Sequence, residues 1–351
     1  MPELPEVETV VKGLTQHIVG QSIKDIKILN KKSFIVPPQL RSLTTSRGNG
    51  QAGNNLKIQK IDRRGKAVII ALSKGMSLLI HLKMTGQLIY VSGSPTSERS
   101  ASGSRMTRGR RHSGEPLGRL QNRMNKSIRS WTSQDDPPSP KGYGGLRGKR
   151  LNLGHPTKDF TEEMPSSHTR VIFELSKGTL YFNDQRKFGW VKLVPTKDVD
   201  KDTFISKLGF EPLSHSFNSD ILWQAIQHHP NSPIKSTLMD QSLIAGIGNI
   251  YSDEALFVAG IHPNRKGKTI TPADNKKLTT AIKKILGLGI KHAGTSIANY
   301  KNAEGLPGRM QNYLKVYGRT GKLCPHKCGV VKSIRIGGRS AHFCPVCQKQ
   351  P

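Results

Sequence analysis

Residues 234–260 read IKSTLMDQSLIAGIGNIYSDEALFVAG, and they set the architecture of the second half of the chain. Gly246 and Gly248 predict a tight turn, and Asn249 lies where the next helix would begin. Free backbone N–H groups at a helix start can bind an anion such as a nucleic-acid phosphate. Lys235 lies upstream and could reach the same phosphate. The same pattern also fits an ordinary pair of packed helices in which the glycines allow close approach.

Further helices are predicted on both sides of this stretch, near 216–229 and over 272–291. The first half of the chain has a different pattern. A helix is predicted over 5–18, because Pro5 suits the first turn and apolar residues recur at helical spacing. The prolines and glutamates at the amino terminus could have no role other than starting this helix, which is the simple alternative to a chemical role.

Short segments rich in Ile, Leu and Val fill residues 22–90, and the same pattern resumes with HTRVIFEL (168–175) and GTLYFND (178–184). Such segments predict a β-sandwich or barrel-like sheet. Residues 92–165 break the pattern, because they are rich in Ser, Gly, Arg and Pro and poor in apolar side chains. We therefore expect a basic disordered insertion there.

The charge of the chain points to a polyanionic partner. The formal net charge is +31, of which residues 92–165 carry +7 (14 Lys/Arg against 7 Asp/Glu), so +24 belongs to the other 277 residues. Nucleic acid is the first candidate for such a partner. A membrane is not expected, because the sequence has neither a basic amphipathic helix nor an apolar run of spanning length.

All four cysteines lie in the last 28 residues, in the pattern C-x3-C-x15-C-x2-C. Two such pairs are typical of a closed tetrahedral zinc site, which is structural because no position stays open for water. Between the pairs, SIRIGGRSAHF predicts a β-hairpin whose Gly-Gly turn would present Arg335 or Arg339 to a nucleic acid. The zinc ligands would be Cys324, Cys328, Cys344 and Cys347.

Three side chains follow predicted strands at turns. Met84 precedes a Gly turn in HLKMTGQL, and Arg186 and Phe188 lie two apart in NDQRKFGW. An apolar wedge with an arginine could fill the gap left when a base leaves the DNA helix. Taken singly, Met84 and Phe188 could equally be core residues.

The amino terminus, MPELPEVETV, could carry chemistry. Methionine before proline is readily removed, which would leave Pro2 as a terminal secondary amine. An α-amino group has a pKa of about 7.7–8.0, so it is a better nucleophile at neutral pH than an ordinary lysine. Attack on an aldehyde-level carbon would give a cationic iminium. Glu3 and Glu6 lie three apart on one helical face and could move protons.

Taken together, MPELPEVETV, DRRGKAVII, the 234–260 stretch, VYGRTGKLC and the cysteine tail resemble formamidopyrimidine-DNA glycosylase. The resemblance covers about residues 1–91 and 166–351 and implies a bifunctional DNA glycosylase and AP lyase. Such an enzyme flips oxidised purines, 8-oxoguanine and formamidopyrimidines, out of damaged double-stranded DNA. The resemblance implies a Schiff base between the terminal proline and C1′, β,δ-elimination, and a role in base excision repair.

The resemblance also assigns roles to single residues. The catalytic set comprises Pro2 as nucleophile, Glu3 as acid/base, Glu6 as support, Lys66 as proton donor, and the zinc-finger Arg339. The DNA-binding set comprises Met84, His168, Arg186, Phe188, Lys235 and Asn249. GTSIANYKNAEGLPG (294–308) is similar to a loop that covers the flipped base. One structural Zn²⁺ is implied. Departures are the C-x3-C pair, Arg170 in place of a second histidine, and the insertion.

The expected architecture is α+β and multidomain: an N-terminal β-sandwich with flanking helices (1–195, with 92–165 inserted), a helical helix–two-turn–helix domain (196–312) and a C-terminal zinc-finger β-hairpin (313–351). A monomeric, cytoplasmic bacterial protein acting on the chromosome is expected, because four zinc-bound thiols fit a reducing compartment. One alternative is the sister class that acts on oxidised pyrimidines, although Pro-Glu-Leu and the 294–308 loop favour purines. Another is a non-catalytic zinc DNA-binding protein.

Overall fold

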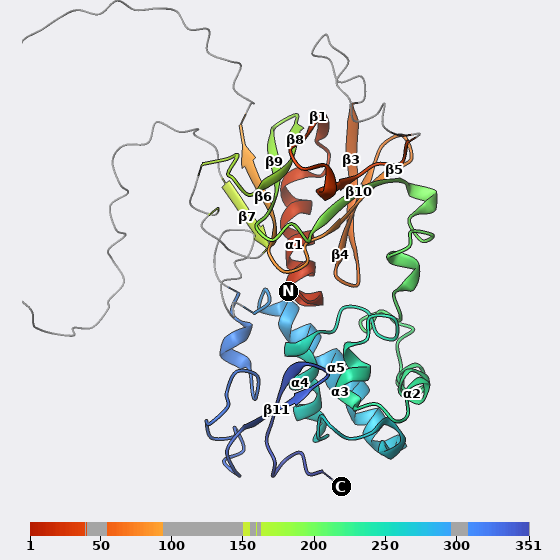
Figure 1. The fold of residues 1–351 in the computed structure, drawn as a ribbon, viewed down its shortest axis with the longest axis vertical. Coiled ribbons are helices and arrows are strands. Elements are labelled where there is room, and N and C mark those ends of the chain that lie inside the picture. The colour runs from red at the N-terminus through yellow and green to blue at the C-terminus, as the bar shows by residue number, and fades with distance from the viewer. Residues whose placement is uncertain are drawn as a thin grey trace, which may run out of the picture. The chain divides into compact units, whose positions relative to one another are not determined.

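The computed structural model describes residues 1–38, 40, 55–93, 150–154, 159, 163–295 and 308–350 (Figure 1). The helices are α1 Leu4–Ile18, α2 Ser219–His228, α3 Ile234–Met239, α4 Asn249–Ala259 and α5 Pro272–Lys291. The strands are β1 Ser22–Ile28, β2 Phe34–Ile35, β3 Leu56–Arg64, β4 Ala67–Leu72, β5 Met76–His81, β6 Gly86–Ser92, β7 Arg150–Gly154, β8 Thr169–Leu175, β9 Gly178–Asp184, β10 Trp190–Pro195, β11 Lys332–Ile336 and β12 Arg339–Phe343.

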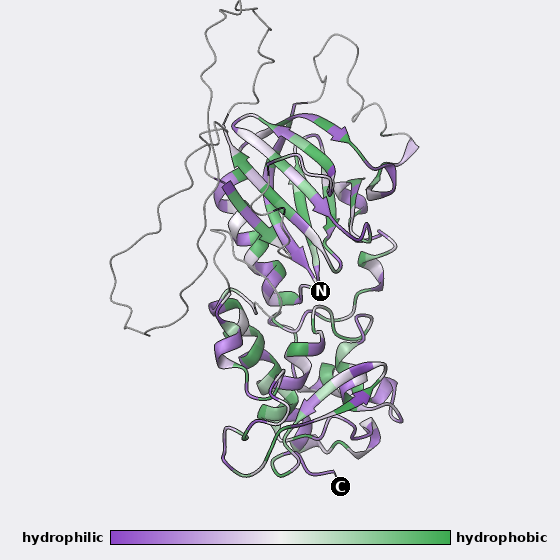
Figure 2. Cartoon of the chain, turned by 60° about the vertical axis from the view of Figure 1, so that its left-hand side comes forward, coloured by the Kyte–Doolittle hydropathy of each residue, from purple (hydrophilic) through white to green (hydrophobic). Residues whose placement is uncertain are grey.

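Within the described ranges, ten strands share one hydrogen-bonded order, β2-β10-β5-β4-β3-β1-β8-β9-β6-β7. The β1–β3 link is short, with Ser22 opposite Lys57 and Ile23 opposite Leu56. The two halves on either side of this link contribute to a single hydrophobic core. Hydrophobic and hydrophilic residues alternate along several strands, as a half-buried sheet requires (Figure 2). This is the predicted sandwich, in which the two layers remain joined along one edge.

Helix α1 completes the core of the sandwich. Its residues Val7, Val10, Leu14 and Ile18 recur at helical spacing and are fully buried. Its first residue inside the helix, Leu4, belongs instead to a second core formed by α2–α5. The amino terminus therefore lies where the sheet meets the helices (Figure 1).

The second core is helical. The predicted long helix is confirmed over Pro272–Lys291, where Thr271 caps the first turn by accepting a hydrogen bond from the Asp274 N–H at 3.1 Å. The predicted turn before Asn249 is also confirmed, because Gly246 has φ +91° and α4 begins at Asn249. The β11–β12 hairpin is confirmed as well, with Ile336 opposite Arg339 around the Gly337-Gly338 turn. None of the described helices combines the length and the apolar character that a membrane-spanning segment needs.

Some expectations need correction. The prediction of disorder over 92–165 is wrong for Arg150–Gly154, which form β7 and pair with β6. Its Leu151 and Leu153 are buried in the sandwich core, and this burial stabilises the strand. The polar composition of the surrounding sequence gave no sign of it. Strands β2 and β10 were not predicted. Most of 92–165 and of the 294–308 loop lies outside the described residues. The domain limits at 195/196 and 312/313 stay predictions.

Candidate active site and nucleic-acid interface

The Glu3 carboxylate occupies the amino-terminal end of α4. It accepts hydrogen bonds from the backbone N–H groups of Gly248 at 2.7 Å, Ile250 at 2.9 Å and Tyr251 at 3.3 Å. The helix start that the sequence suggested as a phosphate site thus holds a carboxylate of the same chain. Burial raises the pKa of Glu3, while Lys66 and the N–H donors oppose that rise. A carboxyl with a raised pKa can hold a proton and later release it.

The Glu6 carboxylate connects the amino terminus by hydrogen bonds to Tyr251 in α4 and to Thr295 after α5. Its Oε2 accepts the backbone N–H of Glu3 at 2.9 Å, which caps α1. Its Oε1 accepts the Tyr251 hydroxyl at 2.8 Å, and the N–H and hydroxyl of Thr295 at 2.8 and 3.0 Å. The simple explanation of the two glutamates as helix-starting residues is therefore part of the picture, because Glu3 is the N-cap residue of α1 and forms a capping box with Glu6. The Glu3 carboxylate binds the start of α4 in addition.

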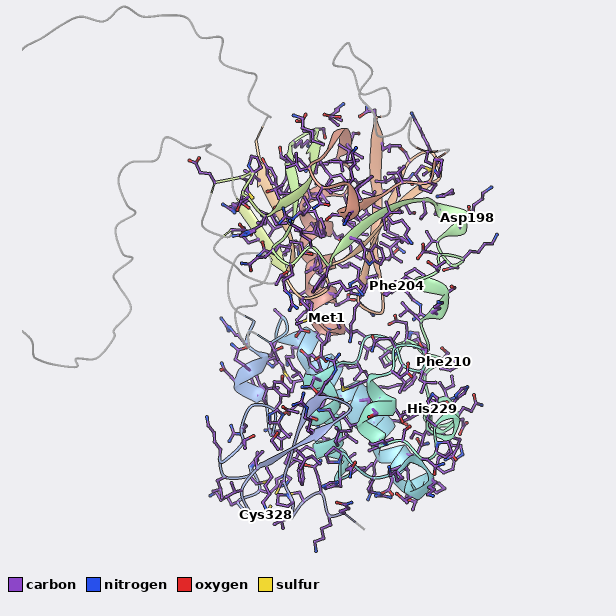
Figure 3. The ribbon with its side chains drawn as sticks, viewed as in Figure 1. Met1, Asp198, Phe204, Phe210, His229 and Cys328 are labelled. Carbon is purple, nitrogen blue, oxygen red and sulfur yellow. The ribbon has the colours of Figure 1, made fainter. Side chains whose placement is uncertain are left out.

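Lys66 and Arg339 complete a cluster of charges around the chain terminus. Lys66 is buried, its Nζ donates to the Ile247 carbonyl at 2.8 Å, and burial lowers its pKa to about 8. Burial also lowers the pKa of the Met1 amino group; Glu3 and Glu6 raise that pKa, and Lys66 and Arg339 lower it further. Pro2 is buried next to this group, which Figure 3 labels at Met1. The residues assigned to catalysis thus come together from three separate parts of the chain. Pro2 is included through the neighbouring Met1 amino group, whose charge interacts with the other four residues.

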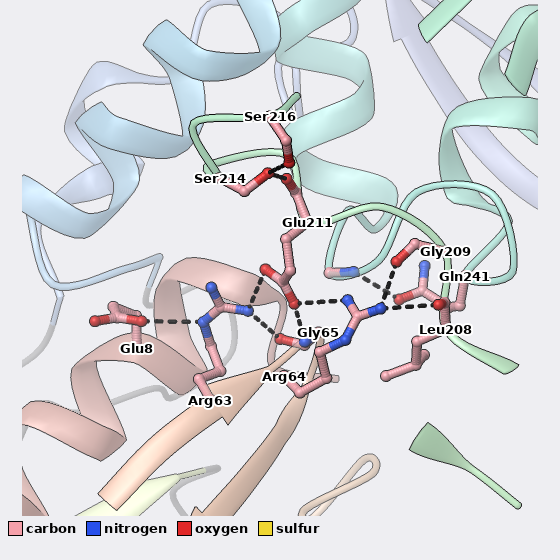
Figure 4. A network of polar contacts seen from close by, with 11 residues as sticks. Glu8, Arg63, Arg64, Gly65, Leu208, Gly209, Glu211, Ser214, Ser216 and Gln241 are labelled. Carbon is pink, nitrogen blue, oxygen red and sulfur yellow. Dashed lines mark hydrogen bonds and ion pairs between the residues drawn. The ribbon is translucent and has the colours of Figure 1, made fainter. Parts of the chain in front are cut away.

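The turn that carries Lys66 is fixed by an ion network (Figure 4). Glu211 accepts Arg63 Nη1 at 2.9 Å, Arg64 Nη1 at 3.1 Å and the Gly65 N–H at 2.5 Å. Arg63 Nε also donates to Glu8 of α1 at 3.0 Å. These partly buried bonds connect the β3–β4 turn with the chain segment that leads into the helices, and so hold Lys66 in place.

Met84, Arg186 and Phe188 are on the surface, as the wedge prediction requires. Met84 is 41% exposed and Phe188 is 56% exposed, so the alternative that they are core residues is wrong. The Arg186 guanidinium lies 4.9 Å from the centre of the Phe188 ring, in a cation–π contact. Their turns neighbour each other, since Gly86 pairs with Asp184 in β6 and β9.

The remaining DNA-binding candidates have mixed surroundings. His168 is partly exposed, and its Nδ1 lies 3.0 Å from Asp159 Oδ1. Arg170 is buried and donates to the Asp184 carbonyl, so its guanidinium supports the fold. Lys235 is buried too; its Nζ binds Asp253 Oδ1 at 2.6 Å and the Ser340 carbonyl at 2.7 Å.

Asn249 begins α4, and its side-chain Oδ1 is buried without a hydrogen-bond partner among the described residues. An asparagine side chain carries an acceptor oxygen and a donor NH₂ group, and rotation about its last bond exchanges their positions. The side chain could therefore turn its NH₂ group toward an incoming acceptor.

The cysteines fit a zinc ion. The four Sγ atoms lie within 4.8 Å of one another, and three Sγ–Sγ distances are 3.6, 3.6 and 3.2 Å. Zn–S bonds of about 2.3 Å in a tetrahedron place sulfurs roughly 3.8 Å apart. Cys324 and Cys344 are buried, and Cys328 is exposed (Figure 3). All four coordination positions are filled by thiolates, so the zinc is structural.

Sequence reasoning missed several residues that hold this site together. Asp253 accepts Lys235 and, through Oδ2, the N–H of His342 at 2.8 Å, which joins α3, α4 and the hairpin. Glu254 accepts backbone N–H groups of residues 315–317. The adjacent acids in the stretch YSDEALF were a usable signal, because two consecutive carboxylates inside an apolar helix need partners.

Sequence models of three domains match the chain. The formamidopyrimidine-DNA glycosylase N-terminal domain matches residues 1–191, the H2TH domain of the same proteins matches 208–301, and the zinc finger found in FPG and IleRS matches 321–350. Curated formamidopyrimidine-DNA glycosylases are similar over nearly their whole length. The one from Pelotomaculum thermopropionicum is 34% identical over 99% of both chains. The one from Streptococcus pyogenes is 32% identical over 100% of this chain and 99% of its own.

Solved structures agree. A Lactococcus lactis FPG mutant in complex with DNA containing Fapy-dG superimposes with a TM-score of 0.71 at 28% identity, covering 99% of this chain and 100% of the other. The complex of the Lactococcus lactis protein with DNA containing an abasic site gives 0.69 at 27% identity with the same coverage. By its domains, its full-length relatives and its fold, the chain belongs to the formamidopyrimidine-DNA glycosylase family.

Proposed function

We propose that the chain is a bifunctional DNA glycosylase and AP lyase that excises oxidised purines from duplex DNA in base excision repair. The observation that carries this proposal is the convergence of the amino terminus, Glu3, Glu6, Lys66 and Arg339, whose charges act on one another. The named relatives and the DNA complexes of the Lactococcus lactis protein support the substrate class.

The proposed first step is nucleophilic substitution at C1′. After removal of Met1, the Pro2 nitrogen attacks C1′ and gives up its proton, the C1′–N9 bond breaks, and the base leaves with its bonding electrons and takes up a proton. Opening of the sugar then breaks C1′–O4′, and a carboxyl proton passes to O4′ as the iminium forms. Glu3 suits this transfer, because burial raises its pKa and α4 fixes its position.

The iminium then acts as the electron sink for strand cleavage. Loss of a C2′ proton breaks the C3′–O bond in β-elimination, and a second loss of a proton breaks the C5′–O bond in δ-elimination. Each phosphate leaves with the electrons of the broken bond. Lys66 suits proton donation during these steps, because its pKa of about 8 leaves it mostly protonated at neutral pH. Hydrolysis of the iminium returns Pro2.

The duplex would be held by the exposed basic residues around this site. Arg339 is exposed at the start of β12, and the zinc keeps its hairpin folded. Met84, Arg186 and Phe188 would enter the space of the extruded nucleotide. Asn249 would donate to a phosphate. Lys235, already paired with Asp253, would act by adding positive charge near that phosphate. A monomer in the bacterial cytoplasm stays the expected setting.

The test is borohydride trapping on a duplex containing 8-oxoguanine, followed by mass spectrometry of the cross-linked peptide. We expect a covalent adduct on Pro2. The variant Pro2→Gly should lose most strand cleavage, and Glu3→Gln should lose base excision while it still binds the duplex. An adduct only on DNA with oxidised pyrimidines would favour the sister class.

Absence of any adduct, from protein that has lost Met1 and binds abasic-site DNA, would leave a non-catalytic DNA-binding protein. Arg339→Ala tests the contribution of the zinc-finger arginine to DNA binding. The variant should bind DNA more weakly while it keeps one zinc per chain.

A further inference from the structure

The Asp184 side chain lies fully buried between the two turns that carry the wedge residues. Its Oδ1 accepts the Thr85 hydroxyl and, at 3.2 Å, the backbone N–H of Arg186. Its Oδ2 accepts the backbone N–H of Gly189 at 2.6 Å. The Thr85 hydroxyl in turn accepts the Arg186 N–H at 3.0 Å. One carboxylate thus binds the turn after β5 and both ends of the turn after β9.

The backbone of Asp184 is fixed independently of its side chain. Its N–H donates to the His168 carbonyl at 2.9 Å, and its carbonyl accepts Arg170 Nε at 2.9 Å. Arg170 is itself buried, and Nη1 donates to the Ser167 carbonyl. Arg170, one of the departures from the family pattern, therefore supports the backbone of Asp184.

Both turns contain a residue in the left-handed region of backbone space. Lys83, directly before Met84, has φ +50°, and Lys187, directly before Phe188, has φ +59°. Such a conformation in a residue with a side chain is unfavourable and persists only where the surroundings impose it. The bonds to Asp184 and Thr85 contribute to that constraint, and on the first turn the Lys83 N–H also donates to His81 Nδ1 at 3.0 Å.

Gly189 allows the second turn to close onto the carboxylate. A Cβ at this position would lie 2.9 Å from Phe182 Cζ, 3.0 Å from the His81 carbonyl oxygen and 3.1 Å from Asp184 Oδ2. The exposed Phe188 is consequently attached to a turn whose next residue is packed against the core.

We propose that Asp184, acting with Thr85, is a positioning residue that sets Met84, Arg186 and Phe188 in the geometry that replaces an extruded nucleotide. This inference rests on the proposed function. The three wedge side chains are exposed, and Arg186 and Phe188 contact each other on the same turn, so the backbone of the two turns sets where they project. Loss of the hydrogen bonds that Asp184 and Thr85 make to the two turns would make the positions of all three side chains less defined. It would leave the charged cluster around the amino terminus unchanged.

The test compares Thr85→Val, which has nearly the same shape but lacks the hydroxyl, with Thr85→Ser, which keeps it. Asp184→Asn is the second variant, because its NH₂ group cannot accept the Gly189 N–H. Each full-length protein is assayed in single turnover on 8-oxoguanine opposite cytosine and on 8-oxoguanine opposite a tetrahydrofuran residue. The second duplex has no base pair to break and no orphaned base to contact.

We expect Thr85→Val and Asp184→Asn to lose about tenfold or more in excision from the paired duplex, which corresponds to one or two lost hydrogen bonds. On the tetrahydrofuran duplex the loss should be about threefold or less, and Thr85→Ser should match the parent protein on both. A general folding defect would instead lower the rate of excision from both duplexes equally.

Equal losses on the two duplexes, or full activity of Thr85→Val on the paired duplex, would overturn the inference. If Asp184→Asn does not fold, Thr85→Val alone decides. If the parent protein excises 8-oxoguanine from neither duplex and gives no borohydride adduct, both the proposed function and the inference are overturned. If the parent protein is active and the variants are as active as the parent, only the inference is overturned.

Discussion

The Glu3 carboxylate lies against the backbone of Gly248, with a hydrogen bond of 2.7 Å from the Gly248 N–H to Oε2. The contact is close enough that a Cβ on Gly248 would lie 2.4 Å from Glu3 Cδ and 2.6 Å from Oε1. Gly248 has φ −134°, which any residue adopts, so the glycine is required for space. The residue directly after the proposed nucleophile is thereby fixed by a segment 245 positions away.

Gly248→Ala should therefore displace the Glu3 carboxylate without straining the backbone. We expect base excision to fall about 100-fold, because a shift of about 1 Å in a catalytic group can have an effect of that size. Single-turnover excision of 8-oxoguanine measures it. Full excision by this variant would show that the observed position of Glu3 is not needed.

Gly287→Ala is the matched control. Gly287 lies on the exposed side of α5, and a Cβ there would meet nothing within 4 Å. The substitution should raise the free energy of unfolding by about 0.5–1 kcal/mol, because alanine loses less chain entropy in a helix. Excision should not change.

Lys66 makes the products of strand cleavage depend on pH. Burial lowers its pKa from 10.5 to about 8, so the fraction that can donate a proton falls as the pH rises through 8. On abasic-site DNA we expect the share of δ-elimination products to decrease above that pH. Gel separation of the cleaved ends measures the ratio between the two products.

Lys66→Met should give a low share of δ-elimination at every pH. Lys60→Met is its control, because Lys60 is exposed on the same β3–β4 hairpin and should leave the profile unchanged. A profile that is the same in the parent protein and in Lys66→Met would remove Lys66 from this step.

Removal of zinc should unfold the hairpin and spare the sandwich. The sandwich core contains no residue beyond Leu193 among those described, whereas Cys324 and Cys344 form a separate small core with Phe257, Val316 and Val331. An isolated two-stranded hairpin is barely stable. Cys344→Ser should therefore release most of the zinc and weaken DNA binding about tenfold or more, through loss of the Arg339 position.

Metal analysis, DNA titration and hydrogen exchange of β3–β5 check this. His326→Ala is the control: His326 Nδ1 lies 3.3 Å from Cys347 Sγ, outside the four-thiolate set, and this variant should keep one zinc per chain. Loss of protection in β3–β5 by Cys344→Ser would show that the sandwich depends on the metal.

The elements that could be predicted from sequence are those with a local cause. Periodicity and a proline identify α1 and α5, glycines identify the turn before Asn249, and cysteine spacing identifies the zinc site. The amino-terminal Pro2, Glu3 and Glu6 could be singled out from their chemistry, as could the arginines of the hairpin, and the resemblance then assigned their roles. Glu211 could not be found, because its partners on the β3–β4 turn lie about 146 positions away in the sequence. Asp184 binds two nearby N–H groups, but its link to Thr85, 99 positions away, exists only in the tertiary fold. Strand β7 was missed because two buried leucines are too few to stand out in a polar segment.

The position of β7 changes the best deletion for testing the insertion. Val91 of β6 pairs with Arg150 of β7, so removal of 96–147 would leave residues 93–95 and 148–149 to close the hairpin. A loop of this length is common between antiparallel strands. We expect this variant to fold and to excise 8-oxoguanine from short duplexes like the parent protein.

Deletion of all of 92–165 should behave differently, because it removes β7 and with it Leu151 and Leu153, which are 4% and 0% exposed. Loss of one such side chain lowers stability by about 2–5 kcal/mol, so this variant should melt well below the shorter deletion. Residues 96–147 also carry a net +7, from 11 Lys/Arg and 4 Asp/Glu. The shorter deletion should therefore bind long undamaged DNA more weakly at low salt, with a shallower salt dependence. Thermal melts and salt titrations check both, and unfolding of the shorter deletion would show that residues 96–147 contribute to the folded core.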